Sequence, residues 1–130
     1  MKYLCLGYHD EKLWQAQSEN ERRVLMEETF AYAKYLKVNG HIIDDHALQE
    51  ISQAATLRFE KGKVSITDGP FAETKEQLGG IMVIEANDLN HAIQLMSKMP
   101  CMQMGGSIEI RPVNEAIKFN TDSERTLTAA

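Results

Sequence analysis

The chain has 130 residues, of which 43% are hydrophobic and 25% are charged, and its formal net charge is -5. This length and composition are typical of one soluble globular domain, and the lack of any Lys/Arg run argues against a nucleic-acid-binding surface, which needs clustered basic residues. No apolar stretch approaches the roughly 20 residues that span a bilayer, and the first apolar run is too short for a secretory signal, so we expect a cytoplasmic protein that contacts no membrane.

The first strand and helix have clear signals. Residues 2–8 (KYLCLGY) are apolar enough for a largely buried strand. Ser18 and Glu21 then have the spacing of a capping box, which predicts a helix that ends at Asn39 and Gly40. The apolar stripe predicted for this helix consists of Leu25, Met26, Phe30, Tyr32, Ala33 and Leu36.

A β-hairpin is predicted over residues 56–68, after a short strand and an irregular connection in residues 41–52. Lys61 and Gly62 form its two-residue turn, because Gly readily takes a positive φ. This register places Leu57 opposite Ile66, Phe59 opposite Val64 and Glu60 opposite Lys63.

The remaining elements are a buried strand, a second helix and a last strand. Residues 80–85 (GIMVIE) predict the strand, and Asn87 and Asp88 cap a helix that Pro100 ends. The apolar side of this helix is predicted to hold Leu89, Ala92, Ile93 and Met96. Residues 107–113 close a domain of residues 1–113, with Ile108 and Ile110 on one face, and residues 114–130 are expected to be a partly ordered tail.

This order of elements predicts an α+β fold of the ferredoxin-like type, with two β-α-β units, an antiparallel sheet and an added hairpin. Both helices cover the same face of such a sheet. The other face carries Tyr, Leu, Ile and Val side chains that nothing in the chain covers. A second copy is the simplest cover, so we expect a homodimer.

The stretch TDGPFAETKEQLGG at residues 67–80, followed by a strand, an acid-capped helix and SIEIRPV, closely resembles the DGPF-domain branch of the YCII-related family. The opening MKYLCLGYHDE and the glycine pair before the last strand also resemble that family. The resemblance covers residues 1–113 and implies a dimeric α/β barrel, in which two ferredoxin-like sheets meet face to face.

The functional implications of this resemblance are limited. The family consists of small proteins of unassigned activity, and its YCII branch is suspected of catalysis because a His and an Asp recur in a cleft. Some DGPF members resemble companions of extracytoplasmic-function sigma factors. In this chain Thr29 occupies the position at which the YCII branch has its helix histidine. Residues 96–104 (MSKMPCMQM) lack the Asp-Pro of that branch, so the resemblance assigns no catalytic acid–base pair to this chain.

The polar residues around the DGPF segment are the candidate ligand site. Asp68 is the candidate proton acceptor or ligand anchor, and Glu73 and Lys75 are charged partners that would shift its pKa. Phe71 would plug the end of the barrel, Arg58 would hold a carboxylate or phosphate, and Tyr8 would add a hydroxyl. The alternative is structural: Asp68 caps a turn, Phe71 is core, Arg58 points outward and the other charges form a solvated loop.

Other reaction chemistries lack support in the sequence. His41 and His46 are five residues apart, which places them on opposite faces of a strand, so no metal site is predicted. No phosphate loop or nucleophile elbow is present, and no cofactor is predicted. Cys5 and Cys101 form no C-x-x-C motif and are expected to be reduced and packed.

Two functions remain open from the sequence. The first is a small-molecule-binding domain with a cleft at the DGPF segment, with or without weak acid–base catalysis. The second is a non-enzymatic dimeric module that regulates a protein partner, such as an extracytoplasmic-function sigma factor. Whether the chain is an enzyme is not decided by the sequence.

Overall fold

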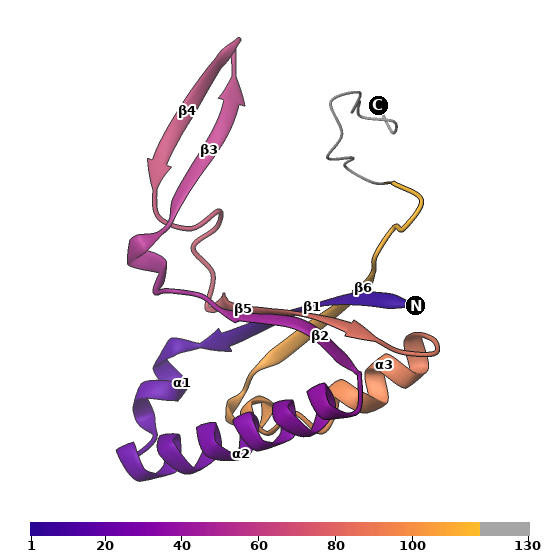
Figure 1. Cartoon of the computed structure of the whole chain (residues 1–130). Coiled ribbons are helices and arrows are strands. Elements are labelled where there is room, and N and C mark those ends of the chain that lie inside the picture. Colours follow the sequence, from indigo (N-terminus) through magenta and orange to yellow (C-terminus); the bar gives the residue numbers. More distant parts are fainter. Residues whose placement is uncertain (118–130) are drawn as a thin grey trace.

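The computed structural model describes residues 1–117 and places helices on one face of an antiparallel sheet, with a hairpin standing away from the other face (Figure 1). The sheet contains, in spatial order, β2 (Ile42–Ala47), β5 (Glu76–Glu85), β1 (Lys2–Asp10) and β6 (Ser107–Pro112). The helices are α1 (Glu11–Ala16), α2 (Glu19–Val38) and α3 (Leu89–Met96), and two 3₁₀ turns cover Ile51–Gln53 and Pro100–Met104. The hairpin consists of β3 (Ala55–Glu60) and β4 (Lys63–Asp68).

The strand order confirms the predicted ferredoxin-like α+β topology. Each neighbouring pair of strands in the main sheet is antiparallel. Helix α2 connects β1 to β2, and α3 connects β5 to β6, so both β-α-β crossings lie on the same side of the sheet (Figure 1). No helix within residues 1–117 has both the length and the apolar character needed to cross a membrane. Of the expected tail, residues 118–130 lie outside the described part of the chain.

Helix α2 begins with the predicted capping box. The Ser18 hydroxyl accepts a hydrogen bond from the Glu21 backbone N–H at 3.1 Å, and the Glu21 carboxylate accepts one from the Ser18 N–H at 3.1 Å. The backbone hydrogen bond from Ser18 is the main reason why the pKa of Glu21 lies below its usual value. Two otherwise unpaired N–H groups are therefore satisfied at the helix start.

Ser18→Ala is expected to destabilise the protein by about 1 kcal/mol, the usual loss when a hydroxyl N-cap is removed. Urea denaturation followed by circular dichroism measures this change, with Ser97→Ala as the matched control. Ser97 lies beyond the last turn of α3, where its hydroxyl donates to the Ile93 carbonyl instead of capping a helix start. Equal stability of Ser18→Ala and the wild type would show that the capping box contributes nothing.

The buried side of α2 differs from the predicted stripe at one position. Leu25 and Leu36 are buried and Tyr32 packs against the core, whereas Phe30 is 64% exposed. The inward face follows positions 25, 29, 32 and 36, and Phe30 lies one residue, about 100°, beyond that line. The prediction of Phe30 as a core residue was therefore wrong.

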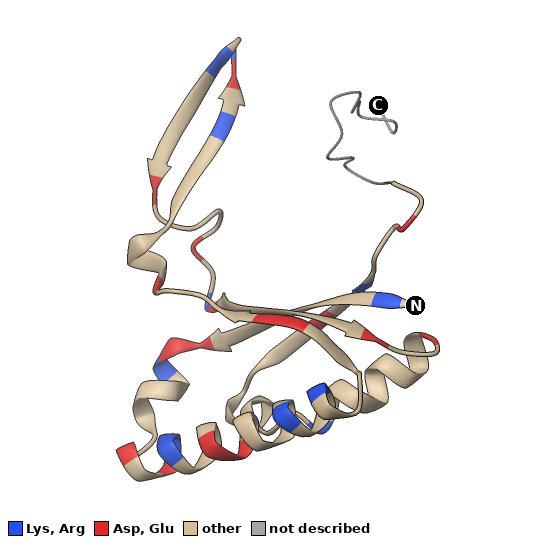
Figure 2. Ribbon diagram, in the orientation of Figure 1, with Lys and Arg blue, Asp and Glu red and all other residues tan. Residues whose placement is uncertain are grey.

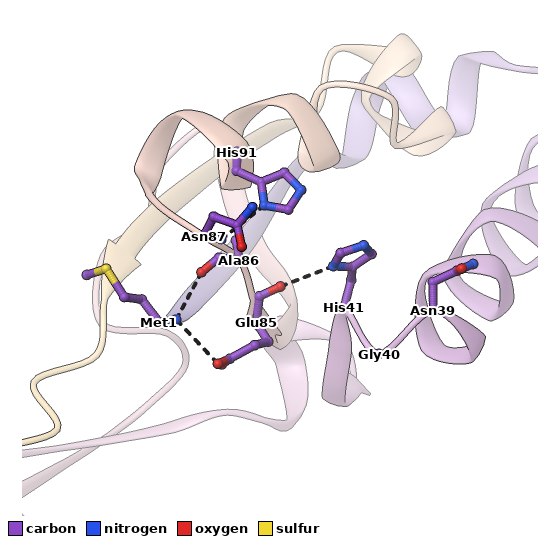
Figure 3. A pocket seen from close by; sticks show the side chains of 8 residues that line it. All are labelled: Met1, Asn39, Gly40, His41, Glu85, Ala86, Asn87 and His91. Atoms are coloured by element: carbon purple, nitrogen blue, oxygen red, sulfur yellow. Dashed lines mark hydrogen bonds and ion pairs between the residues drawn. The ribbon is translucent and has the colours of Figure 1, made fainter.

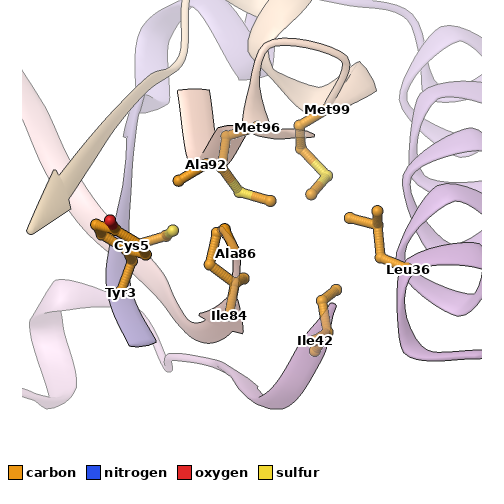
Figure 4. Close-up of a cluster of buried hydrophobic side chains, with 9 residues drawn as sticks. All are labelled: Tyr3, Cys5, Leu36, Ile42, Ile84, Ala86, Ala92, Met96 and Met99. Carbon is orange, nitrogen blue, oxygen red and sulfur yellow. The ribbon is translucent and has the colours of Figure 1, made fainter. Parts of the chain in front are cut away.

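The core lies between the sheet and the helices (Figure 4). It consists of Tyr3, Cys5, Leu36, Ile42, Ile84, Ala86, Ala92, Met96 and Met99. Of the predicted α3 stripe, Ala92 and Met96 are buried, but Leu89 and Ile93 remain about half exposed. Burial raises the pKa of the Cys5 thiol to about 11, so this thiol stays neutral and unreactive at physiological pH.

The β3–β4 hairpin, called the arm below, has the predicted register at all three pairs. Its two strands pair only with each other, and it rises on the side of the sheet away from the helices (Figure 1). One face of the arm is apolar and consists of Leu57, Phe59, Val64 and Ile66, whose exposed fractions lie between 59% and 75%. Because an isolated two-stranded hairpin is only marginally stable in water, this face needs a partner surface.

Candidate functional site

The face of the main sheet that the helices leave uncovered carries an organised set of side chains, called the open face below. Tyr3, Cys5 and Ile84 point into the core, so the residues that alternate with them along β1 and β5 point the opposite way. The strand register aligns these residues in two rows across the sheet, first Asp44, Val83, Leu4 and Arg111, then His46, Ile81, Leu6 and Glu109. Each row has aliphatic residues at its centre and a polar residue at each end.

The polar group on the β2 edge of the open face is a histidine–aspartate pair. His46 Nε2 lies 3.1 Å from Asp44 Oδ2, and both side chains are 61% exposed. A carboxylate only accepts hydrogen bonds, so Nε2 carries the proton and donates it, which leaves the lone pair of neutral His46 on Nδ1. The pair therefore presents an oriented proton acceptor.

A β-bulge brings this pair to the open face. Ile42 pairs with Ile84, but the next aligned pair is Asp44 with Val83, so β2 has one extra residue at Ile43. A shift of one residue turns every following side chain to the other face of the sheet. Asp45 consequently points toward the helices, where it pairs with Lys37 at 2.9 Å. The His46–Asp44 pair could not be recognised from the sequence, because regular alternation from Ile42 places both residues on the core face.

The polar group on the β6 edge consists of Tyr8, Glu109 and Arg111. The Tyr8 hydroxyl donates to Glu109 Oε1 at 3.5 Å, and Arg111 Nε lies 3.9 Å from Glu109 Oε2. Tyr8 was predicted as a ligand-contacting hydroxyl, and it lies on the open face beside Leu6. The sequence analysis did not assign Glu109 or Arg111 to a site, although their alternation with Ile108 and Ile110 was a usable signal.

The side chains of the DGPF segment are arranged differently from the candidate ligand site expected there. Arg58 donates to the Phe71 carbonyl at 2.9 Å, and its guanidinium carbon lies 5.2 Å from the centre of the Phe71 ring. Arg58 thus fastens residue 71 to the base of the arm through a hydrogen bond and a cation–π contact. Phe71 is 77% exposed, so within a single chain it plugs nothing.

The predicted charge cluster around Asp68 does not form. Lys75 Nζ instead lies 3.7 Å from Asp10 Oδ2, the buried carboxylate that caps α1 by accepting from the backbone N–H groups of Lys12 and Leu13. Within residues 1–117, no hydrogen bond or ion pair joins the side chain of Asp68 or Glu73 to another group, and both residues are exposed. Lys75 thus lies beside Asp10 and not beside Asp68, and a ligand-binding role for Asp68, Glu73 and Lys75 stays a prediction.

A shallow hollow of about 350 Å³ lies at the other end of the sheet from the arm (Figure 3). The rings of His41 and His91 meet edge to face there, with their centres 5.3 Å apart. His91 Nδ1 accepts the Asn87 backbone N–H at 3.0 Å, and His41 Nδ1 lies 3.3 Å from the Glu85 carbonyl oxygen. These contacts order the start of α3, which is a structural role. In the described part of the chain, no three His, Cys, Asp or Glu residues converge to hold a metal ion.

Along the described ribbon, Lys and Arg alternate with Asp and Glu, and the arm carries both signs (Figure 2). The open face therefore combines the features of a binding surface for a small organic molecule: an aliphatic floor, an oriented imidazole at one edge, and a hydroxyl, a carboxylate and a guanidinium at the other.

Three similarities to known proteins bear on this fold and this face. The model of the YCII-related domain matches residues 1–117. An uncharacterised protein of Rhizobium meliloti (strain 1021) is 36% identical over 115 residues, which cover 87% of this chain and 92% of that protein. A solved structure also has a similar fold: 5-chloro-2-hydroxyhydroquinone dehydrochlorinase from Burkholderia phenoliruptrix AC1100, in complex with 2,5-dihydroxybenzoquinone. The TM-score is 0.52 at 16% sequence identity, and the match covers 87% of this chain and 93% of the dehydrochlorinase chain.

Proposed function

Because this chain belongs to the YCII-related family, we propose that it works as a homodimer that binds a small, planar, weakly acidic organic molecule on its open face. The observation that carries this proposal is the pair of rows on the open face, in which four aliphatic side chains lie between two polar groups. One of these groups, His46 with Asp44, can accept a proton on Nδ1 when Nε2 donates to the carboxylate.

The open face and the arm support the homodimer. Leu4, Leu6, Ile81 and Val83 form a continuous aliphatic strip that the chain's own helices leave uncovered. Two such strips packed together exclude water from both, in the arrangement of a dimeric α/β barrel. The apolar face of the arm lies on the same side of the sheet, so the second copy is its natural partner as well.

The chemistry of the polar groups supports the class of ligand. A flat ring can lie against the aliphatic floor beside the polar group, and a weakly acidic hydroxyl on it can give its proton to His46 Nδ1, where Asp44 stabilises the resulting imidazolium. The similar fold of the dehydrochlorinase holds 2,5-dihydroxybenzoquinone, a flat conjugated molecule with hydroxyl and carbonyl oxygens at opposite ends, which makes that compound the first probe to test.

The test is a titration of the wild-type protein with 2,5-dihydroxybenzoquinone, followed by calorimetry. His46→Ala and Asp44→Asn are expected to weaken binding by at least tenfold, because a hydrogen bond to a charged group contributes about 1.5–3 kcal/mol. Asp68→Asn is the matched control for Asp44→Asn, since it makes the same change on an exposed carboxylate that has no hydrogen-bond or ion-pair partner within residues 1–117. A ligand site at the DGPF segment predicts the loss of binding at Asp68→Asn instead. No binding by the wild type, or equal binding by His46→Ala, would refute the proposal.

The exposed apolar face of the arm also favours the second candidate function, a regulatory module with a protein partner such as an extracytoplasmic-function sigma factor. The two functions differ in the purified homodimer. If the second copy covers the arm, the amide protons of residues 56–67 exchange slowly in hydrogen-exchange measurements. If they exchange as fast as in an unfolded peptide, the arm still lacks its partner, and the regulatory function is favoured.

A further inference from the structure

The two polar groups of the open face are too far apart in one chain to act on one small ring. His46 and Asp44 lie on β2, and Tyr8, Glu109 and Arg111 converge at β6, on opposite edges of a four-stranded sheet. Three interstrand spacings separate these edges, which is about 14 Å. A single chain therefore offers two half-sites, each with one kind of chemistry.

Two open faces can be packed together by a two-fold axis in either of two directions. An axis parallel to the strands lays the β2 edge of one copy over the β6 edge of the other. It places Asp44 opposite Arg111 and His46 opposite Glu109, while the central aliphatic residues meet each other. An axis across the strands lays β2 over β2 instead and keeps the two kinds of half-site apart.

The arm distinguishes these two arrangements. It rises from the end of β2 at Ala47, which is the same end of the sheet at which β6 begins at Ser107. With the axis parallel to the strands, the arm passes the β6 edge of the second copy at that end. Strands of six residues reach about 20 Å, which covers the spacing of about 10 Å between two packed sheets and leaves about 10 Å to pass the edge of the second sheet toward its helix layer.

An apolar groove lies at that position. It is lined by Ile93, Met96, Ser97, Met102, Ile108 and Ile110, on the helix side of β6. A chain's own arm cannot reach this groove, because the arm leaves the opposite side of the sheet (Figure 1). With the axis across the strands, the arm meets the end of the second copy that carries the polar His41–His91 hollow, which does not match an apolar face.

From these observations we infer that the ligand site is composite: His46 and Asp44 come from one copy, Tyr8, Glu109 and Arg111 come from the second copy, and each dimer holds two such sites. This inference rests on the proposed function and deepens it. The ligand class that fits is a conjugated hydroxy-carbonyl compound with its two oxygens at opposite ends. Its hydroxyl proton moves to His46 Nδ1, and the negative charge moves through the conjugated system to the far oxygen, which accepts hydrogen bonds from Arg111 and Tyr8.

Mixed dimers test the composite site with 2,5-dihydroxybenzoquinone as the probe. His46→Ala and Arg111→Met homodimers are each expected to bind at least tenfold more weakly than the wild type, since every site loses one group. A heterodimer of the two variants carries both defects in one site and none in the other. It is expected to recover wild-type affinity at half the wild-type stoichiometry.

The outcomes separate the two proposals. A heterodimer that binds as weakly as both homodimers would show that each site belongs to one chain, which overturns the composite site and leaves the proposed function intact. Homodimers of both variants that bind like the wild type would overturn the proposed function itself. The two variants carry different affinity tags. Purification on both tags in succession isolates the heterodimer, and size-exclusion chromatography confirms its size.

A short bismaleimide tests the same geometry without any ligand. Asp44→Cys mixed with Arg111→Cys is expected to give a cross-linked heterodimer, while neither variant alone gives a cross-linked homodimer. Cys101→Ser in all chains removes the half-buried native thiol, and the Cys5 thiol is buried. Cross-linked homodimers of Asp44→Cys would instead show that β2 lies over β2, and the composite site would be wrong.

Discussion

Leu6→Arg is expected to convert the dimer into folded monomers. Leu6 lies at the centre of the second row, beside Ile81 on one side and Glu109 on the other. In the proposed face-to-face dimer the second copy would remove this side chain from water, and burying an unpaired guanidinium there would cost several kcal/mol. The dissociation constant of the dimer should therefore rise by about a thousandfold or more.

The fold of each chain should survive this substitution. The core residues Tyr3 and Cys5 alternate with Leu6 on β1 and point to the other side of the sheet, so their packing is unchanged. Sedimentation velocity measures the mass, and circular dichroism confirms the secondary structure. Val38→Arg is the matched control: Val38 is 76% exposed at the end of α2, and its replacement should leave the dimer intact. A stable Leu6→Arg dimer would show that the copies associate through another surface.

Phe59→Ser combined with Val64→Ser is expected to weaken the dimer by about a hundredfold or more. The two residues face each other across the arm and are exposed in the single chain. If the second copy buries them, each contributes about 1.5–3 kcal/mol to association. Sedimentation equilibrium gives the change in the dissociation constant.

A neighbouring pair on the same arm provides the control. Glu60→Ser combined with Lys63→Ser makes the same number of substitutions at the next cross-strand pair, which lies on the polar face of the arm. These changes should leave the dissociation constant within about a factor of three, because exposed charges contribute little to stability or association. Similar effects of the two double variants would mean that the arm acts through its backbone or its charge and not through an apolar contact.

Local signals in the sequence predicted much of the fold. The capping box at Ser18, the register of the arm and the caps of α3 depend on residues a few positions apart, and all three were confirmed. The alternation of Ile108 and Ile110 also identified the inward face of β6. These features could be predicted because each is decided by backbone hydrogen bonds or by periodicity within one segment.

The features that were missed depend on contacts between distant segments. The short helix α1 begins where the Asp10 carboxylate can be buried, and Lys75 reaches Asp10 from a loop more than sixty residues away. The bulge in β2 depends on how that strand pairs with β5, so the His46–Asp44 pair could not be assigned to a face by alternation alone. The density of polar residues in the sequence instead pointed to the DGPF segment. There Lys75 lies beside Asp10, and the Asp68 side chain has no partner within residues 1–117.

The extra residue at Ile43 also bears on how the open face of such a protein can change. Substitution of His46 or Asp44 removes a polar group from that face directly. Loss of the single codon for Ile43 would keep both residues and still turn them toward the helices, and a later insertion would return them. Within this fold, a short insertion or deletion at a strand edge can thus remove a polar pair from a sheet face and restore it while both residues stay encoded.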